Sequence, residues 1–214
     1  MKVTVLCSDI SHPVNSYLNR WMSSVSEDFS VELVRKKQDC TSGDILFLVS
    51  CSEIISKEER EKYDNCLVLH ASALPEGRGW SPHVWQLIEG AAGITLSLIE
   101  ADDHVDSGCI WKQIYLPVPS DALWNEINDL LFRAEIELIN FAIENFDKVK
   151  PIEQPLESAS YFRKRTPQDS KIDPTKTIAE QFDLIRVCDP DRFPAYFEHR
   201  GCRYLMKLEK QDDE

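Results

Sequence analysis

The amino-acid sequence predicts an α/β protein with a mostly parallel sheet. Apolar or alternating runs typical of strands occupy residues 3–7, 29–34, 44–49 and 66–69. Apolar residues at helical spacing follow Val14, and residues 57–63 form a short, highly charged helical segment. Strands that alternate with helices pair in parallel, and proteins built in this way bind ligands beyond the carboxyl ends of their strands.

The far edge of the sheet is expected to be antiparallel. Residues 93–99 and 110–116 predict two further strands, and the loop 100–108 between them is too short for a helical crossover. A long helix is expected over residues 120–146, with Ser120 as its N-cap. One face of this helix is apolar and carries Leu123, Ile127, Leu130, Leu131, Ala134, Leu138 and Ala142.

A change of character near residue 150 suggests two parts. Residues 151–155 look like a linker between a core of residues 1–150 and a small C-terminal α+β segment of residues 151–214. The elements expected in this segment are a basic and aromatic loop at 161–167, an amphipathic helix at 178–187, and a hairpin of 193–197 and 203–208 around Gly201. We expect this segment to contribute to substrate binding.

Composition describes a folded domain without membrane contact. The 214 residues suffice for a full core, no apolar run approaches the roughly 20 residues that span a bilayer, and the N-terminus lacks a secretory pattern, so we expect a cytoplasmic protein. The net charge of −13 argues against nucleic-acid binding, although residues 161–210 carry 11 basic against 8 acidic side chains and could meet a small anion. The seven scattered cysteines predict free thiols, with Cys7 and Cys66 filling the core.

His70 is the strongest candidate for a catalytic group. It ends the apolar run 66–69 and precedes a loop that contains Gly77 and Gly79. An imidazole changes charge near neutral pH and suits general acid or base catalysis, and Asp106 could orient it. The alternative is a hydrogen-bonded histidine with a structural role only. The other histidines lack comparable context and are expected at structural or surface positions: His12, His83, His104 and His199.

Metal and thiol chemistry find less support. A metal site would have to use His70, His104, Asp102 and Asp106, whose spacing matches no ligand pattern with a geometric rationale. A Cys66 nucleophile would lie in the buried interior of a strand. We therefore expect no metal.

The basic loop admits two interpretations. Arg163, Lys164 and Arg165 could bind phosphate while Tyr161, Phe162 or Phe193 stacks on a base, or the loop could be a solvated basic turn. No G-x-G-x-x-G or P-loop motif occurs, so a nucleotide cofactor of the usual kind is not indicated.

Several short motifs between residues 70 and 110 resemble one family signature. They are His70-Ala71-Ser72-Ala73-Leu74-Pro75, Arg78-Gly79, Pro82, Gly93-Ile94-Thr95 and Asp106-Ser107-Gly108-Cys109-Ile110. In order and spacing they resemble H-x-S-x-L-P-x-x-R-G-x-x-P, G-(V/I)-T and D-(S/T)-G-x-I of the 10-formyltetrahydrofolate-dependent formyltransferases. The resemblance implies a Rossmann-like catalytic core and 10-formyltetrahydrofolate as the formyl donor.

Within this family, residues 78–85 and 162–170 are most similar to the enzymes that formylate nucleotide sugars, those of pseudaminic-acid biosynthesis in particular. This resemblance implies a small-molecule acceptor, a UDP-linked 4-amino sugar. The chain ends without the large RNA-binding domain of a tRNA enzyme, which fits the same expectation. The oligomeric state stays open, with a homodimer compatible with the sequence.

The resemblance also implies roles for individual residues. His70 would act on the tetrahedral centre formed when the amine attacks the formyl carbon, and Asp106 would orient His70 and help to take the amine proton. The donor would contact Ile54, Ile55, Glu100, Asp102, Asp103 and Val105. The acceptor would contact Arg78, Gly79, Trp80, Arg163 and Arg165.

Val68 departs from the family pattern. The family has Asn two residues before the histidine, where its amide donates to the formyl oxygen, and an apolar side chain cannot do so. Another donor, such as the Ser72 hydroxyl, a backbone amide or water, would have to replace it. Two alternatives follow: a degenerate binder of folate or nucleotide sugar, or a formyltransferase that acts on a non-sugar amine.

Overall fold

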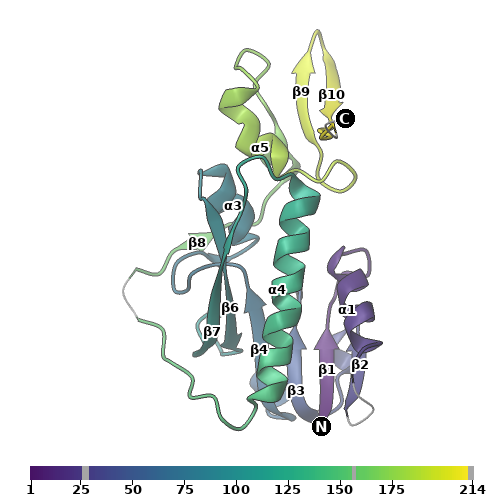
Figure 1. Cartoon of the computed structure of the whole chain (residues 1–214), viewed down its shortest axis with the longest axis vertical. Coiled ribbons are helices and arrows are strands. Elements are labelled where there is room, and N and C mark those ends of the chain that lie inside the picture. The colour runs from purple at the N-terminus through teal and green to yellow at the C-terminus, as the bar shows by residue number, and fades with distance from the viewer. Residues whose placement is uncertain (26–28, 156–157, 212–214) are drawn as a thin grey trace.

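A six-stranded mixed sheet forms the centre of the computed structural model, which describes residues 1–25, 29–155 and 158–211 (Figure 1). In sheet order its strands are β2 (Ser30–Val34), β1 (Lys2–Leu6), β3 (Gly43–Leu48), β4 (Tyr63–His70), β6 (Gly93–Glu100) and β7 (Ile110–Pro117). The first four are parallel, whereas β6 pairs antiparallel with β4 and β7 pairs antiparallel with β6. The predicted Rossmann-like α/β fold with its antiparallel edge is confirmed.

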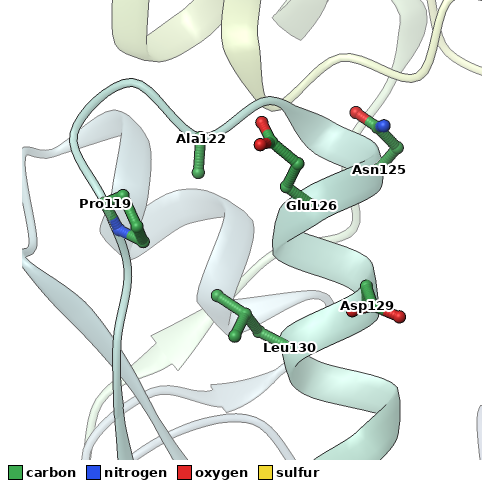
Figure 2. Close-up of a pocket in the computed structure, with 6 residues that line it drawn as sticks. All are labelled: Pro119, Ala122, Asn125, Glu126, Asp129 and Leu130. Carbon is green, nitrogen blue, oxygen red and sulfur yellow. The ribbon is translucent and has the colours of Figure 1, made fainter.

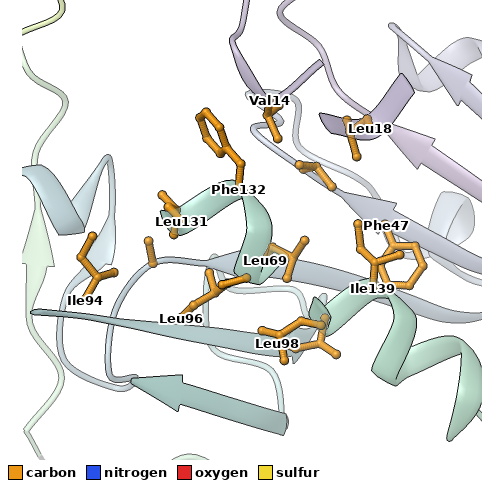
Figure 3. Close-up of a cluster of buried hydrophobic side chains, with 14 of the residues drawn as sticks. Val14, Leu18, Phe47, Leu69, Ile94, Leu96, Leu98, Leu131, Phe132 and Ile139 are labelled. Carbon is orange, nitrogen blue, oxygen red and sulfur yellow. The ribbon is translucent and has the colours of Figure 1, made fainter. Parts of the chain in front are cut away.

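Two helices cover one face of this sheet. In Figure 1 the helices α1 (Val14–Met22) and α4 (Trp124–Glu144) lie side by side over the strands. Alternate residues of β4, such as Leu67 and Leu69, point to this side and are buried against α4. Figure 3 shows the resulting core, in which apolar side chains of the sheet meet Leu131, Phe132 and Ile139.

The opposite face of the sheet has a thinner cover. Leu46, Leu48, Ile55 and Cys66 form a smaller buried cluster there, with Val68 packed against it. The cover consists of loops and the short helix α2 (Lys57–Arg60), which begins with a reciprocal cap between Ser56 and Glu59. The helix expected over 57–63 is shorter than predicted because β4 already begins at Tyr63.

The start of α4 also differs from the prediction. Ser120 does not cap the helix, because it lies in a turn closed by a hydrogen bond from the Ala122 N–H to the Pro119 carbonyl. The helix begins at Trp124, and the Glu126 carboxylate accepts the N–H of Leu123 at 2.8 Å. The Glu126 carboxylate thus satisfies the N–H of the residue that precedes the helix, and the helix ends at Glu144 rather than at residue 146.

Several small elements lie outside the six-stranded sheet. The helix α3 (Pro82–Ile88) follows β5 (Arg78–Gly79), and β8 (Tyr161–Phe162) pairs in parallel with β5, which the sequence did not predict. The expected helix at 178–187 is a 3-10 turn, η3 (Ala179–Gln181), followed by α5 (Phe182–Arg186). Two further 3-10 turns are η1 (Lys37–Asp39) and η2 (Pro167–Ser170). The predicted hairpin is present as β9 (Ala195–His199) and β10 (Cys202–Met206).

All seven cysteines lie in the described residues and are free, with Cys7 and Cys66 buried as predicted. Among the helices of the described residues, none combines the length and apolar character that crossing a membrane requires.

Candidate active site

His70 lies at the carboxyl end of β4 with an almost completely buried side chain. Its Nε2 is 2.9 Å from the carbonyl oxygen of Gly77. A carbonyl can only accept, so Nε2 carries the proton of the neutral ring and Nδ1 carries the lone pair. Nδ1 lies 3.4 Å from Oδ1 of Asp106. The Asp106 carboxylate therefore lies where it can stabilise positive charge that develops on the His70 ring during a reaction.

Asp106 is held in place by the backbone around it. It lies in the loop after β6 with a φ of 57°, in the left-handed region that residues with a Cβ seldom adopt. Its Oδ2 accepts the main-chain N–H of Gly79 at 2.8 Å. A Cβ at Gly108 would lie 1.9 Å from the carbonyl oxygen of Glu100, so only glycine allows the loop to fold back so closely. The motif glycines thus bring His70 and Asp106 together.

The residues expected to meet the donor gather at the loops beside α2. Ile54 is 70% exposed and Val105 is 50% exposed, whereas Ile55 is buried. The Glu100 carboxylate accepts the indole N–H of Trp111 at 3.1 Å, and Asp102 accepts the N–H of Asp103 at 2.7 Å. This part of the candidate site therefore has exposed apolar side chains next to a loop, residues 100–103, that is held by hydrogen bonds.

Arg60 is the residue of this region that sequence reasoning missed. Its Nη1 donates to the carbonyl oxygens of Ile55 at 3.0 Å and Asp102 at 3.3 Å, and its Nη2 pairs with the Asp103 carboxylate. This ion pair holds the pKa of Asp103 below its ordinary value. Arg60 ties the Ile55 segment to the Asp102 loop, and a single arginine in a charged segment carries no sequence signal for that role.

The residues expected to meet the acceptor lie along β5 and β8. Nη2 of Arg78 donates to Gln154 Oε1 at 2.7 Å. The main-chain N–H of Gly79 donates to the Asp106 carboxylate. Trp80 is 43% exposed, and Nζ of Lys164 lies 4.4 Å from the centre of one of its rings. Trp80 and Lys164 form an exposed aromatic and basic surface next to the end of β5.

Arg163 and Arg165 make contacts within the C-terminal segment. Arg163 forms two hydrogen bonds to Asp169, whose pKa is held well below its usual range, and also lies over Trp85 at 4.8 Å. Nη2 of Arg165 donates to the Asp169 carbonyl at 3.1 Å. The Arg163 side chain is still 63% exposed, so it can meet a ligand from its open side.

Val68 lies on the same face of β4 as His70 and is half-buried. Its register neighbours are Leu48 on β3 and Ile99 on β6, both apolar. Ser72, considered as a replacement donor, is completely buried, and within the described residues its hydroxyl has no hydrogen-bond partner. Its burial makes it a poor donor to a bound formyl group.

Burial favours the neutral form of three further groups, His12, His83 and Cys66. Burial lowers the pKa of His12 to about 4, and the same effect lowers that of His83 to about 4. The Cys66 thiol has a pKa raised to about 12, which argues against a nucleophilic role. Over the described part of the chain, no cluster of His, Cys, Asp and Glu side chains is arranged to hold a metal ion.

A surface hollow at the start of α4 lies apart from this pair (Figure 2). It is lined by Pro119, Ala122, Asn125, Glu126, Asp129 and Leu130. Neither His70 nor Asp106 contributes to its lining, so we do not assign it to the candidate site.

The sheet topology defines a Rossmann-like protein, and the candidate site at His70 lies beyond the carboxyl ends of the parallel strands. Residues 8–143 match the family described as "Formyl transferase". Because this match covers more than half of the sequence, the chain belongs to the formyl transferase family.

Similar sequences carry the name methionyl-tRNA formyltransferase. The protein from Rickettsia africae is 27% identical over 180 residues, which are 83% of this chain and 57% of that protein. The protein from Clostridium botulinum is 29% identical over 185 residues, which are 84% of this chain and 57% of that protein. This chain thus spans little more than half the length of these relatives.

Similar folds are found in several solved structures. Methionyl-tRNA formyltransferase from Clostridium thermocellum superposes with a TM-score of 0.81 at 22% identity, covering 95% of this chain and 90% of that chain. A 4-N formyltransferase from Francisella tularensis gives 0.76 at 19% identity, covering 99% and 98%. HypX from Aquifex aeolicus in complex with tetrahydrofolic acid gives 0.80 at 19% identity, covering 95% and 36%. At these identities the likeness establishes the fold.

Proposed function

We propose that this chain transfers a formyl group from 10-formyltetrahydrofolate to the amino group of a nucleotide-linked amino sugar, specifically a UDP-linked 4-amino sugar as in pseudaminic-acid biosynthesis. The observation that carries the proposal is the buried pair of His70 and Asp106 in a chain of the formyl transferase family. Solved structures of similar fold include both a 4-N formyltransferase and a methionyl-tRNA formyltransferase, so this chain's own residues carry the proposal for the acceptor.

His70 and Asp106 suit the proton transfers of this reaction. When bound, the donor supplies an electrophilic formyl carbon, which the acceptor amine attacks. With Nε2 held by Gly77, Nδ1 can receive the proton that the amine loses as its new N–C bond forms. The imidazolium then faces Asp106, whose fixed carboxylate stabilises the charge that appears during the reaction. His70 returns the proton to the departing nitrogen as the old N–C bond breaks.

The donor side fits a flat, partly apolar ring system. Ile54 and Val105 expose apolar side chains, and Arg60 braces the two segments that carry them. A pterin could cover these apolar side chains while its polar edge meets the backbone of the Asp102 loop.

The acceptor side fits a nucleotide. Trp80 and Tyr161 are 43% and 62% exposed and could stack on a base, and Lys164 and Arg163 could meet a diphosphate. Residues 151–214 would then complete the acceptor site of the core formed by residues 1–150. The negative charge of the whole chain makes this local basic surface more selective for a small anion than for a long nucleic acid.

A second candidate follows from Val68. Because Val68 and its register neighbours are apolar and bring no side-chain donor, the chain could bind folate or nucleotide sugar and transfer nothing, or it could act slowly on another amine. Binding of both ligands without tetrahydrofolate release would favour the binder, and turnover without UDP binding would favour a non-sugar amine.

The deciding experiment measures tetrahydrofolate release from 10-formyltetrahydrofolate with a panel of UDP-linked amino sugars. We expect turnover with a 4-amino sugar and its loss by at least about a hundredfold in His70→Asn and Asp106→Asn variants that keep the fold. A His70→Asn variant with near-normal turnover would overturn the mechanism, and turnover with methionyl-tRNA alone would overturn the acceptor.

A further inference from the structure

Gln154 lies in the stretch that the sequence marks as a linker, but its amide contacts the candidate site. Its Nε2 donates to the main-chain carbonyls of Asp106 at 2.9 Å and Gly108 at 2.8 Å. Its Oε1 accepts from Nη2 of Arg78 at 2.7 Å. Two carbonyls need a donor and a guanidinium needs an acceptor, so only one orientation of the amide satisfies all three contacts.

The two carbonyls belong to the strained turn that carries the catalytic carboxylate. Asp106 has a φ of 57°, and such a conformation persists only where surrounding contacts hold it. Relaxation of this φ would rotate the side chain away from both His70 Nδ1 and the Gly79 N–H, its present partners at 3.4 and 2.8 Å. The bonds from Gln154 on either side of Ser107 oppose that relaxation.

Gln154 is itself anchored on both sides. Ile152 and Ile110 exchange two main-chain hydrogen bonds of 2.7 and 2.9 Å. Ser160 accepts the Gly77 N–H through its hydroxyl at 2.8 Å and the Arg78 N–H through its carbonyl at 2.9 Å. Ile152 is thus bonded to the start of β7. Ser160 is bonded to Gly77 and Arg78, and the carbonyl of Gly77 also contacts His70.

We propose that Gln154 is a positioning residue for formyl transfer, which sets the Asp106 carboxylate against His70 by holding the Asp106 main chain in its left-handed conformation. This inference rests on the proposed function for its kinetic readout. Gln154 acts through Asp106 and does not need to touch either substrate.

The test compares Gln154→Leu and Gln154→Glu with Gln181→Leu. Glutamate keeps the acceptor for Arg78 but loses both donations, so it isolates the contacts to Asp106 and Gly108. Gln181 is the matched control, because it also donates to two carbonyls, of Asp173 at 3.0 Å and Thr177 at 3.3 Å, and accepts the Asp173 N–H at 2.6 Å. We expect both Gln154 variants to lower kcat by about ten- to a hundredfold with KM values changed less than about threefold, and Gln181→Leu to match wild type.

A double-mutant cycle separates positioning from a general structural effect. Because Gln154 acts through the Asp106 carboxylate, Gln154→Leu should cause no further loss of kcat in an Asp106→Asn background. Equal losses in both backgrounds, or a wild-type kcat for Gln154→Glu, would overturn the proposal. If Gln154→Leu does not fold, Gln154→Glu in the same cycle decides.

A second readout does not depend on turnover. In ¹⁵N NMR spectra, the ring signals of His70 should move in the same direction in Gln154→Glu and Asp106→Asn and stay unchanged in Gln181→Leu. Unchanged His70 signals in Gln154→Glu would overturn the positioning role. If the wild-type protein formylates no amine but the variants show the expected His70 shifts, the proposed function is contradicted and the role of Gln154 in positioning Asp106 is supported.

Discussion

Oδ2 of Asp106 accepts a hydrogen bond of 2.8 Å from the main-chain N–H of Gly79, 27 residues earlier in the chain. Gly79 has a φ of +96°, and a Cβ there would lie 2.4 Å from the carbonyl oxygen of Phe162. A side chain at this position would therefore separate β5 from β8 and move the N–H away from the carboxylate. The strands β5 and β8 and the loop that carries Asp106, which are distant in the chain, therefore meet around one carboxylate.

Replacing Val68 by Asn should raise the rate. Val68 shares its strand face with His70, so an amide at this position could donate to the formyl oxygen as the family pattern implies. One oxyanion donor is worth roughly a hundredfold in kcat, and we expect at least about a tenfold gain in tetrahydrofolate release. Val68→Leu, which brings no donor, is the control, and equal rates for the two variants would contradict the prediction.

Gly108→Ala should destabilise the loop through a clash, whereas Gly90→Ala should show only backbone strain. A Cβ at Gly108 meets the Glu100 carbonyl oxygen at 1.9 Å, while Gly90 has a φ of +90° and nothing within 4 Å of such a Cβ. We expect losses in the free energy of unfolding of roughly 2–4 kcal/mol for Gly108→Ala and about 1 kcal/mol for Gly90→Ala. Urea denaturation measures both free energies of unfolding. A larger loss for Gly90→Ala than for Gly108→Ala would contradict the predicted clash at Gly108.

Glu135→Gln should stabilise the protein most at alkaline pH. Glu135 is buried in α4, and burial raises its pKa to about 8. Between pH 4.5, the ordinary pKa of a glutamate, and about pH 8, the folded state binds more protons than the unfolded state, so the free energy of unfolding falls as pH rises through this window.

Glutamine does not titrate and removes this loss, which should amount to a few kcal/mol by pH 8. Thermal or urea unfolding at pH 5 and pH 8.5 measures the difference. Glu137→Gln, at an exposed position of the same helix, is the control. A stabilisation that is the same at both pH values would show that Glu135 is ionised in the folded protein.

Trp80→Ala should weaken acceptor binding without changing the chemistry. The exposed indole lies beside Lys164, and loss of one stacking platform costs about 1–3 kcal/mol. We expect the KM for the UDP-linked sugar to rise about tenfold, while the KM for 10-formyltetrahydrofolate stays constant. Tyr115→Ala, at an exposed aromatic position on β7, is the control. An unchanged acceptor KM would exclude Trp80 from nucleotide binding.

Local patterns in the sequence were sufficient to predict the sheet and the pair at the centre of the candidate site. Buried strands such as β1 and β3 are continuous apolar runs, and the histidine at the end of β4 with the glycine-bearing motif around Asp106 identifies the pair that the structure brings to 3.4 Å. The strands were predictable because each depends on residues close together in the chain, and the pair was predictable because His70 and Asp106 lie in motifs whose order and spacing resemble a family signature. The place of Ser120 outside the helix could not be predicted in this way, since Ser120 lies in a turn that follows the last strand, β7, and is closed by a hydrogen bond from Ala122 to Pro119.

The supports of the site became visible only in the tertiary structure. The sequence determined which imidazole and which carboxylate meet, but Arg60, Gln154 and the pairing of β5 with β8 show no periodicity and no motif. Gln154 reaches Asp106 across 48 residues and Arg78 across 76. Contacts of this kind follow from where the folded core places the backbone carbonyls and N–H groups, because these groups are the same at every position of the sequence and acquire partners only in three dimensions.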